Sequence, residues 1–310
     1  MNRIVITGPT GAIGTAIIRQ CVAEGIEVYA IVRKNSNRIN RIEKCDKVHL
    51  IECDLSELKD LPVDNIPKCD VFYHLGWGAT IGDGRNDMNL QTANIQYTLD
   101  AVRLADRLGC HTFVGTGSQA EYGRFEGKLN ESVPTFPENG YGIAKLCAGQ
   151  MSAIECHKFD IRHIWVRILS IYGPGDSDKT MITTTINKLM NKERASFTKA
   201  EQMWDYLYSE DAARALILMG KSEKSKGIYC LGSGIARPLR EYIEVLAKNI
   251  SQETNLGFGD VEYGDKQVMY LCADIERLTK DTGFVPEVTF DEGIKKTIEW
   301  MKQRLSYEEN

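Results

Sequence analysis

Short runs of apolar residues alternate, along the first half of the chain, with longer stretches whose apolar positions recur at helical spacing. The runs have the continuous hydrophobic character of strands buried on both faces of a sheet, and they cover residues 3–7, 27–32, 48–52, 71–75, 111–116 and 162–168. Helices are predicted over residues 12–24, about 87–108 and about 141–159. This alternation implies right-handed strand–helix–strand crossovers, so we expect an α/β fold with a doubly wound parallel sheet of the Rossmann type.

The rhythm changes after about residue 170. A turn with the sequence Tyr172-Gly-Pro-Gly-Asp176 breaks the pattern, a helix is predicted over about 180–192, and shorter elements follow. We therefore expect residues 1–170 to form the sheet domain. Residues 171–310 should form mainly a smaller C-terminal lobe for the substrate, with some segments returning to the sheet. No repeat or low-complexity linker intervenes, so the lobe is expected to pack directly on the sheet.

A glycine-rich turn joins the first predicted strand to the first predicted helix. Glycines in such a turn let the main chain approach a pyrophosphate, whose negative charge is met by the N-terminus of the helix. Because the motif lies directly between a strand and a helix, it predicts a dinucleotide-binding loop rather than a plain tight turn. The segment comprises Gly8, Pro9, Thr10, Gly11, Ala12, Ile13 and Gly14.

Far downstream, Tyr141 and Lys145 are four residues apart on a predicted helix. That spacing puts both side chains on one face, one turn apart. A protonated lysine there stabilises a phenolate, so we expect the pKa of the tyrosine to fall from about 10 towards neutrality, as an acid–base group requires. By itself the pattern occurs on many surface helices. Together with the glycine loop it predicts a hydride-transfer site.

A serine, Ser118, follows the fifth predicted strand within residues 113–123. Ligands of open α/β sheets bind at the carboxyl ends of the strands. We therefore expect Ser118 to hydrogen-bond a substrate carbonyl while Tyr141 donates the proton that neutralises the developing alkoxide. The alternative is a serine that only caps a turn.

The residues after the second and third strands bear on the choice of cofactor. When the adenosine ribose has a free 2′-hydroxyl, the second strand normally ends in Asp or Glu. Here it is followed by Arg33, Lys34 and Ser36, which suit a 2′-phosphate, so we expect NADPH; if these charges are merely solvated, NADH or NAD is the alternative. Asp54 and Leu55 are expected to flank the adenine, unless Asp54 is only a helix cap.

Composition limits the possible partners. The chain has 310 residues, 43% hydrophobic and 26% charged, and a net charge of −5. No Lys/Arg cluster points to nucleic acid or anionic lipid, and no apolar run reaches membrane-spanning length. The N-terminus is interpreted as a buried strand and not as a signal peptide. Nine cysteines without metal-like spacing indicate reduced thiols of a cytoplasmic protein, without zinc or disulfides.

On these residues the chain resembles, over nearly all its length, the extended short-chain dehydrogenase/reductase family of nucleotide-sugar epimerases, dehydratases and ketoreductases. The motifs that carry the likeness are residues 7–14, His74-Leu-Gly-Trp77, Asn94 in Asn-Ile-Gln-Tyr-Thr, the Ser118 segment, Tyr141 with Lys145, residues 167–174 and residues 204–211.

The resemblance implies an NAD(P)-dependent oxidoreductase with the catalytic triad Ser118, Tyr141 and Lys145. Lys145 would also hold the nicotinamide ribose, and Asn94 would support the active-site lysine or its helix through its backbone. Further cofactor contacts implied are Leu75, Gly76, Trp77, Thr116, Ile168 and Leu169. Further substrate contacts expected are Thr80, Gln119, Ser170, Lys179, Thr180, Met181, Trp204 and Gln267.

Relatives often dimerise through the helices before Leu108 and around Tyr141, so we expect a homodimer. Leu99, Val102 and Leu146 fit such an interface and fit packing on the sheet equally well.

Three departures from the family pattern affect the expected substrate. Ser170 stands where many relatives have Asn, and Trp204 stands where many have the Arg that contacts the substrate diphosphate; a core tryptophan is the alternative. Gln119 and Ala120 replace the Asp-Glu pair of the dehydratases, so elimination of water is not expected. Glu121 is interpreted as part of a structural turn.

The first hypothesis is therefore an NADPH-dependent 4-ketoreductase of an NDP-4-keto-6-deoxyhexose. The alternative is an NAD-dependent 4-epimerase of a UDP-sugar, similar to UDP-glucose 4-epimerase, which retains its cofactor and returns the hydride to the other face of a rotated ketone. A reductase of a non-nucleotide ketone is a third possibility. A nucleotide-sensing protein without chemistry is a fourth, although such relatives usually lose the tyrosine or the lysine. The sugar, the base and the C4 stereochemistry are not specified by these motifs.

Overall fold

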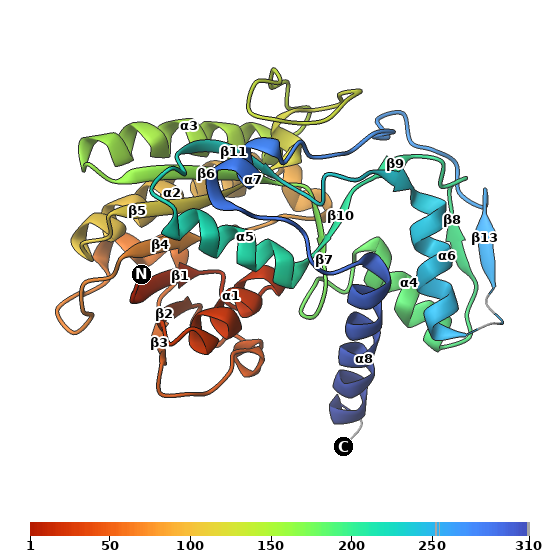
Figure 1. Ribbon diagram of the computed structural model, residues 1–310, viewed down its shortest axis with the longest axis horizontal. Coiled ribbons are helices and arrows are strands. Elements are labelled where there is room, and N and C mark those ends of the chain that lie inside the picture. The colour runs from red at the N-terminus through yellow and green to blue at the C-terminus, as the bar shows by residue number, and fades with distance from the viewer. Residues whose placement is uncertain (252, 254, 309–310) are drawn as a thin grey trace.

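The computed structural model describes residues 1–251, 253 and 255–308. Its main sheet has seven parallel strands in the order β11-β6-β5-β4-β1-β2-β3 (Figure 1). Each of the six strands predicted from the sequence is present, and the doubly wound parallel sheet is confirmed. The strands are β1 (Arg3–Thr7), β2 (Glu27–Val32), β3 (Val48–Glu52), β4 (Val71–His74), β5 (Thr112–Ser118), β6 (Arg162–Ile168) and β11 (Gly227–Leu231).

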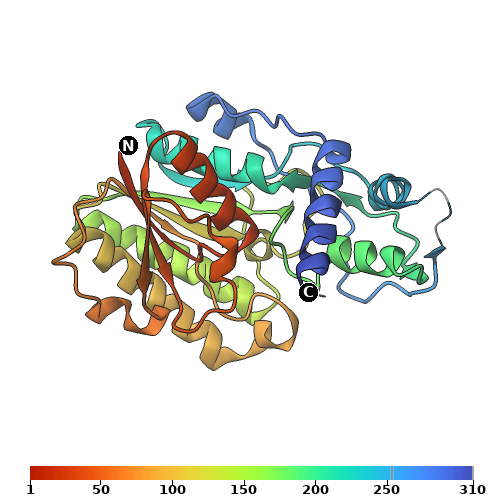
Figure 2. The ribbon, with the colours of Figure 1, turned by 90° about the horizontal axis from the view of Figure 1, so that it is seen from below.

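Helices cover both faces of this sheet. Figures 1 and 2 show α1 (Ala12–Ala23) and α5 (Ser209–Lys221) on one face, with α2 (Met88–Arg107) and α3 (Gly140–Lys158) on the other. Successive residues of β1 enter different cores, because side chains alternate along a strand: Ile4 and Ile6 join the core under α1, whereas Val5 joins the core under α2. Burial on both faces explains the apolar runs of β1, β2 and β4.

A second lobe lies to the right of the sheet in Figure 1. Its helices are α4 (Met181–Met190), α6 (Leu239–Ile250) and α8 (Phe290–Glu308), and its core includes Tyr172, Ile186, Ile243, Leu246 and Ile294. Three small two-stranded sheets complete it: β7 (Ser170–Tyr172) with β10 (Tyr206–Tyr208), β8 (Ala195–Phe197) with β13 (Leu256–Phe258), and β9 (Met203–Trp204) with β12 (Arg237–Pro238).

The chain crosses between the lobe and the sheet more than once. After building α4, β8 and β9 it returns with α5, which packs beside α1, and then with β11, which pairs in parallel with β6. The short helix α7 (Glu276–Thr282) lies next to β11 and α5 before α8 ends the described chain. In the part of the chain that the structure describes, short 3-10 helices lie in the connections: η1 (Ile39–Arg41), η2 (Leu55–Asp60), η3 (Gly82–Asn86) and η4 (Gln119–Glu121).

A buried carboxylate ties the lobe together close to the sheet. Asp205 accepts hydrogen bonds from the main-chain N–H groups of Ser233, Gly234 and Ala273, and from the Ser233 hydroxyl. Burial raises the pKa of the Asp205 carboxyl, although these donors oppose the rise. The three chain segments therefore meet at one fixed point beside Trp204.

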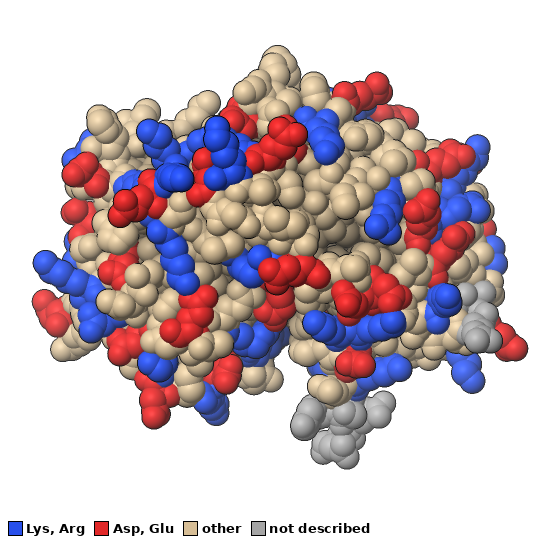
Figure 3. Space-filling view, in the orientation of Figure 1, with Lys and Arg blue, Asp and Glu red and all other residues tan. Residues whose placement is uncertain are grey.

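The outer surfaces of α2 and α3 expose apolar side chains. Leu99 and Val102 are buried in the protein's own core, so they do not lie at the surface. The apolar residues exposed on the two helices are Met88, Leu90, Ile143, Met151 and Ile154. The homodimer stays a prediction. On the face seen in Figure 3, acidic and basic residues are interspersed, and none of the described helices is long and apolar enough to cross a membrane.

Candidate active site

A cleft of about 290 Å³ opens at the carboxyl ends of β1, β4, β5 and β6. Most of the predicted cofactor loop, the whole predicted triad and the residues after β6 meet in it. Gly117, Ile171 and Asp176 also line it, and the sequence did not single them out. The lining residues are Gly8, Gly11, Ala12, Ile13, Gly14, Leu75, Trp77, Thr80, Thr116, Gly117, Ser118, Tyr141, Lys145, Ile168, Leu169, Ile171 and Asp176.

The glycine loop is shaped by contacts that exclude side chains at two of its positions. Gly8 has φ +70°, and a Cβ there would lie 2.8 Å from the Leu75 carbonyl carbon. A Cβ on Gly14 would lie 2.4 Å from the Gly8 oxygen. Gly11, by contrast, meets only the Gly8 oxygen at 3.8 Å, and as the N-cap of α1 it makes no side-chain cap. Its open side and the uncapped helix terminus suit a pyrophosphate.

At the edge of this loop, Leu55 approaches Gly76 from the start of η2. A Cβ on Gly76 would be 3.0 Å from a Leu55 methyl and 3.1 Å from the Thr7 hydroxyl. Asp54 occupies the N-cap position of η2 but makes no side-chain cap hydrogen bond. The alternative that Asp54 is only a helix cap is therefore not supported, because its carboxylate does not bond the N–H groups at the start of η2. Thr10 is half-buried in the glycine loop and lies outside the lining of the cleft.

The predicted 2′-phosphate residues lie on the exposed loop after β2. Lys34 forms an ion pair with Glu57 of η2 at 2.9 Å, with both side chains about half exposed. The Ser36 hydroxyl accepts a hydrogen bond from the Arg38 N–H at 3.4 Å. Arg33 is exposed, and its side chain makes no hydrogen bond or ion pair with any residue that the structure describes. The loop therefore presents guanidinium and ammonium groups beside the end of β2.

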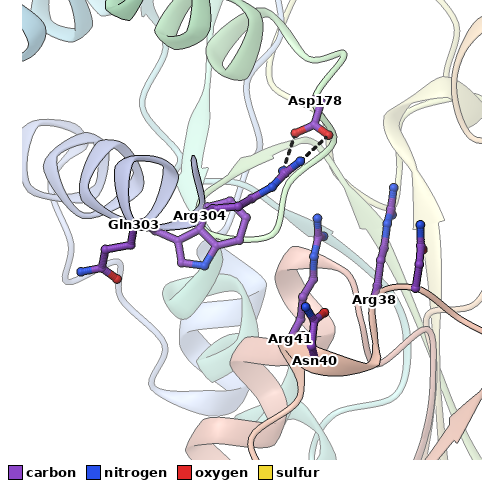
Figure 4. A pocket seen from close by; sticks show the side chains of 8 residues that line it. Arg38, Asn40, Arg41, Asp178, Gln303 and Arg304 are labelled. Carbon is purple, nitrogen blue, oxygen red and sulfur yellow. Dashed lines mark hydrogen bonds and ion pairs between the residues drawn. The ribbon is translucent and has the colours of Figure 1, made fainter. Parts of the chain in front are cut away.

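A second cavity, of about 560 Å³, lies between this loop and α8 (Figure 4). Arg304 of α8 forms an ion pair with Asp178 at 2.8 Å, and Arg41 of η1 donates to the Gly175 carbonyl at 3.0 Å. A Cβ on Gly175 would lie 3.5 Å from the Ala12 Cα. The segment after β7 is thus held against the first turn of α1 by one arginine from each side. No sequence pattern had indicated these two arginines.

Lys145 is buried one helical turn below Tyr141, as the spacing predicted. Its Nζ donates to the Thr116 carbonyl at 2.6 Å and lies 3.8 Å from the centre of the Trp77 ring. The centre of the Tyr141 ring is farther away, at 5.9 Å. The ammonium is therefore held by the end of β5 and by an aromatic face.

The pKa of Tyr141 does not follow the sequence expectation. Burial raises the pKa of the phenol above its usual value, and a hydrogen bond with Ser118 and the positive charge of Arg85 oppose the rise. Arg85 lies 4.6 Å from the ring centre. The expected fall towards neutrality fails because desolvation outweighs the nearby charges, and because Lys145 is directed at Thr116 and Trp77. Tyr141 is accordingly protonated at neutral pH.

Burial lowers the pKa of Lys145 to about 7, against the opposing influence of Glu121. In the unfolded chain the ammonium persists up to a pH of about 10.4, so between the two values the unfolded state binds more protons. The contribution of Lys145 to folding is hence unfavourable below pH 7 and becomes less so as the pH rises.

We expect Lys145→Met to unfold at higher urea concentration than the wild type at pH 7, by roughly 2 to 4 kcal/mol in free energy of unfolding. The difference should shrink at about pH 9, where the folded wild type no longer carries the charge. Urea titrations of both proteins at both pH values measure this. A variant that is less stable by the same amount at both pH values would show that the buried charge carries no such cost.

The side chain of Asn94 holds the loop after β4. Its side chain accepts from the Gly78 N–H at 2.8 Å and donates to the carbonyls of Gly78 and Leu90. The same loop is fixed by a hydrogen bond from the Trp77 indole to Gln91. Asn94 therefore acts through its side chain on the loop that brings Trp77 over Lys145. Support of Lys145 or α3 through the backbone of Asn94 stays a prediction.

Two of the departures from the family pattern contact each other. The Trp204 indole N–H donates to the Ser170 hydroxyl at 2.8 Å, which joins β9 to β7. Trp204 also packs on the apolar core of the lobe and on a smaller apolar cluster that includes Tyr122 and Cys230. These contacts fit the alternative of a core tryptophan, whereas a contact with the substrate stays a prediction.

The other predicted substrate residues are less closely gathered. Thr180 caps α4 and donates to Asp176, Met181 packs on the lobe core, and Lys179 is exposed. Gln267 donates to the adjacent Val268 carbonyl, and Gln119 begins η4. Unlike Thr80 and Ser118, these five residues do not line the 290 Å³ cleft, and neither do Ser170 and Trp204.

Asp176 is a site residue that the sequence missed. It ends the Tyr-Gly-Pro-Gly-Asp turn, lines the cleft, and accepts from the Ser177 N–H and the Thr180 hydroxyl. Burial raises the pKa of its carboxyl to about 6. In the sequence, Asp176 was marked only by the turn to which it belongs. A turn motif predicts a change of chain direction but does not predict which of its side chains will line a cleft.

A cleft lined by the glycine loop together with Ser118, Tyr141 and Lys145, at the carboxyl ends of a doubly wound sheet, is the arrangement of a Rossmann-type enzyme of the short-chain dehydrogenase/reductase class. A profile described as the NAD dependent epimerase/dehydratase family matches residues 4–232. The chain belongs to that family, and is an enzyme of the extended short-chain dehydrogenase/reductase type.

Relatives with several activities resemble the chain. CDP-abequose synthase of Salmonella typhimurium is 22% identical over 95% of this chain and 97% of its own. The dTDP-4-dehydro-6-deoxyglucose reductase of Escherichia coli is 26% identical over 61% of each chain. The structure of UDP-glucuronic acid 4-epimerase from Bacillus cereus in complex with NAD has a TM-score of 0.83 at 18% identity, covering 97% of this chain and 96% of that one.

Proposed function

We propose that the protein is an NADPH-dependent 4-ketoreductase acting on an NDP-4-keto-6-deoxyhexose. The observation that carries this proposal is the end of β2, where Arg33 and Lys34 stand in place of the acidic residue that suits a free ribose 2′-hydroxyl. Arg33 is exposed there, and Arg38 and Arg41 follow on the same loop. The likeness to a dTDP-4-dehydro-6-deoxyglucose reductase agrees with this choice.

The protonation state of the site also favours reduction. A reductase needs a proton donor for the oxygen that becomes an alkoxide, and the raised pKa of Tyr141 keeps its phenol protonated at neutral pH. An epimerase must first remove a proton from the sugar hydroxyl, for which a phenolate is required. NADPH, when bound, supplies the hydride.

The residues of the chain then have distinct roles. Ser118 hydrogen-bonds the ketone oxygen and Tyr141 donates its proton to it. Arg85, which lies over the Tyr141 ring, stabilises the phenolate left behind. Lys145, held by Thr116 and covered by Trp77, contacts the cofactor ribose. Gly11 and the start of α1 hold the pyrophosphate, and Asp54 and Leu55 flank the adenine.

We also propose how the two parts of the chain share the binding of cofactor and substrate. Residues 1–170 bind the cofactor, and residues 171–310 supply most contacts to the nucleotide sugar, with the Trp204–Ser170 pair at the border. Trp204 offers an indole where an arginine would offer a charge, so it contacts the substrate by ring packing instead of by an ion pair with the diphosphate. A homodimer through the exposed apolar residues of α2 and α3 completes the proposal.

The double variant Arg33→Ala/Lys34→Ala tests whether these two residues bind the 2′-phosphate of NADPH. We expect its dissociation constant for NADPH to rise at least about tenfold, because two charge-assisted contacts to the 2′-phosphate are lost. The constant for NADH should stay within about twofold of the wild type. Both are measured by nucleotide fluorescence on protein freed of retained cofactor.

Lys59→Ala, which removes an exposed charge of η2 close by, is the matched control and should leave both constants unchanged. Glu57→Gln should tighten NADPH binding, because it removes the carboxylate that pairs with Lys34. Equal losses for NADPH and NADH in the double variant would remove the case for NADPH.

The second candidate is an NAD-dependent 4-epimerase. It is favoured by the similarity to the UDP-glucuronic acid 4-epimerase structure that holds NAD. An epimerase would be purified with NAD retained and would interconvert C4 epimers without net oxidation of added NADPH.

A further inference from the structure

Glu121, the last residue of η4 after β5, has a fully buried carboxylate that the proposed mechanism does not use. Its Oε1 accepts from the main-chain N–H of Ser118 at 2.8 Å and from the Trp165 indole at 3.1 Å. Its Oε2 accepts from Arg167 at 2.7 Å. The Ser118 hydroxyl in turn accepts from the Ala120 N–H, so Ser118 and Glu121 form a reciprocal capping box around η4.

The surrounding chain makes room for this carboxylate. A Cβ on Gly117 would lie 2.2 Å from the Glu121 Oε1 and 2.4 Å from the Trp165 Nε1. Cβ atoms on Gly115 and Gly149 would come within 2.5 Å and 2.7 Å of the same indole. Glu121 and Trp165 therefore occupy space that three glycines leave open, from β5 on one side and α3 on the other.

The carboxylate stands among buried cations. Arg167, 3% exposed, is its ion-pair partner from β6. Lys145, also 3% exposed, lies 6.0 Å from the centre of the Trp165 ring whose N–H bonds Glu121. Two buried positive charges thus flank one buried negative charge, and an unbalanced buried charge is costly.

Other charged groups face Tyr141 and Lys145 from the remaining elements. Arg85 of η3 lies over the Tyr141 ring, and Asp176 lines the cleft. His74 of β4 is held between the hydroxyls of Thr7 and Thr98, and burial lowers its pKa to about 3, so it is neutral at working pH. Of the described carboxylates near the pair, Glu121 is thus the one that is fully buried.

We propose that Glu121 is a positioning residue of the site, which orients Ser118 through its main-chain N–H and supplies the buried negative charge that balances Lys145. This inference rests on the proposed roles of Ser118, Tyr141 and Lys145. Glu121 acts on two members of the triad at once without touching the substrate.

The two roles have opposite effects on the titration of Tyr141. The negative charge of Glu121 disfavours a nearby phenolate and so raises the pKa of Tyr141, whereas the hydrogen bond with Ser118 lowers it. Glu121→Gln removes the charge but keeps an oxygen that accepts from Ser118. Glu121→Asp keeps the charge but withdraws the carboxylate from Ser118 by one methylene.

The test is an NMR titration of isotope-labelled tyrosine in the full chain, with the Tyr141 signal assigned from Tyr141→Phe. We expect Glu121→Gln to lower the midpoint of Tyr141 by about one pH unit. Glu121→Asp should raise it, because the hydrogen bond from Ser118 that lowers the pKa of Tyr141 is weakened while the negative charge stays. The control is Glu155→Gln, which removes a largely buried carboxylate from the same helix as Tyr141, where it pairs with Arg103 and Lys158. In this variant the midpoint of Tyr141 should equal that of the wild type.

If Tyr141 titrates at the same midpoint in Glu121→Gln as in Glu155→Gln, Glu121 does not supply the balancing negative charge. A midpoint in Glu121→Asp equal to or below that of the wild type would overturn the orientation of Ser118. Should Glu121→Gln fail to fold, Glu121→Asp decides alone, since a midpoint that does not rise contradicts the proposal. The titration needs neither cofactor nor substrate, so loss of the proposed reductase function would leave its outcome unaffected.

Discussion

Tyr141→Phe is expected to lower the rate of ketone reduction by roughly 10²- to 10⁴-fold, the range that a positioned general acid contributes. The variant keeps the ring, which packs edge-on against Trp77 at 6.1 Å and under Arg85, and loses only the proton donor. The dissociation constant for NADPH should therefore remain within about threefold of the wild type. Single-turnover reduction and nucleotide fluorescence measure the two quantities on one preparation.

The matched control is Tyr73→Phe, which removes a buried hydroxyl of β4 that bonds the Leu216 carbonyl on the opposite face of the sheet from α3. It should cost about 1 kcal/mol of stability and leave the rate unchanged. If Tyr141→Phe retained more than about a tenth of the wild-type rate, the proton would come from another group, and Ser118 would be the first to examine.

Gly14→Ala is expected to destabilise the protein by about 2 to 3 kcal/mol and to abolish cofactor binding. The added methyl would lie 2.4 Å from the Gly8 oxygen and 2.8 Å from the Pro9 Cα, both main-chain atoms. Main-chain atoms cannot rotate out of the way as a side chain can, so the Gly8–Pro9 segment must move away from the first turn of α1. Urea unfolding and nucleotide fluorescence give the two effects.

In the same loop, Gly11→Ala should weaken cofactor binding while leaving the stability of the protein nearly unchanged. Its methyl meets only the Gly8 oxygen, at 3.8 Å, so stability should change by less than about 1 kcal/mol. It nevertheless occupies the open side of the cleft at the start of α1, so the constant for NADPH should rise at least about tenfold. Unchanged NADPH binding in Gly11→Ala would place the pyrophosphate elsewhere.

The fold was predictable where local sequence decides local structure. β1, β2 and β4 are largely apolar and buried because both faces of the sheet are covered there, and a strand of that kind has few alternatives. β3, at the edge of the sheet, is partly exposed. β11 was missed because it follows the break at Tyr172 and enters the sheet only after α5 has returned, an order that no local pattern encodes.

The sequence predicted which residues gather at the site better than it predicted the contacts that these residues make. Spacing alone placed Tyr141 and Lys145 on one helical face, and chain order placed Ser118 at a strand end. The partners of Glu121 come from a strand more than forty residues later, so its turn signature gave no hint of Trp165 and Arg167. The direction of the Tyr141 pKa likewise depends on burial, which the sequence does not measure.

Net reduction of a 4-keto sugar by NADPH can be followed in a single assay. Purified protein, freed of retained nucleotide, is mixed with NADPH and an NDP-4-keto-6-deoxyhexose, and the absorbance of the reduced nicotinamide is followed while the sugar product is identified. We expect NADPH to be consumed mole for mole with the ketone, and the product to be the 4-hydroxy sugar. No consumption of NADPH by these ketones, together with retained NAD and interconversion of a UDP-sugar with its C4 epimer, would contradict the account and establish the epimerase in its place.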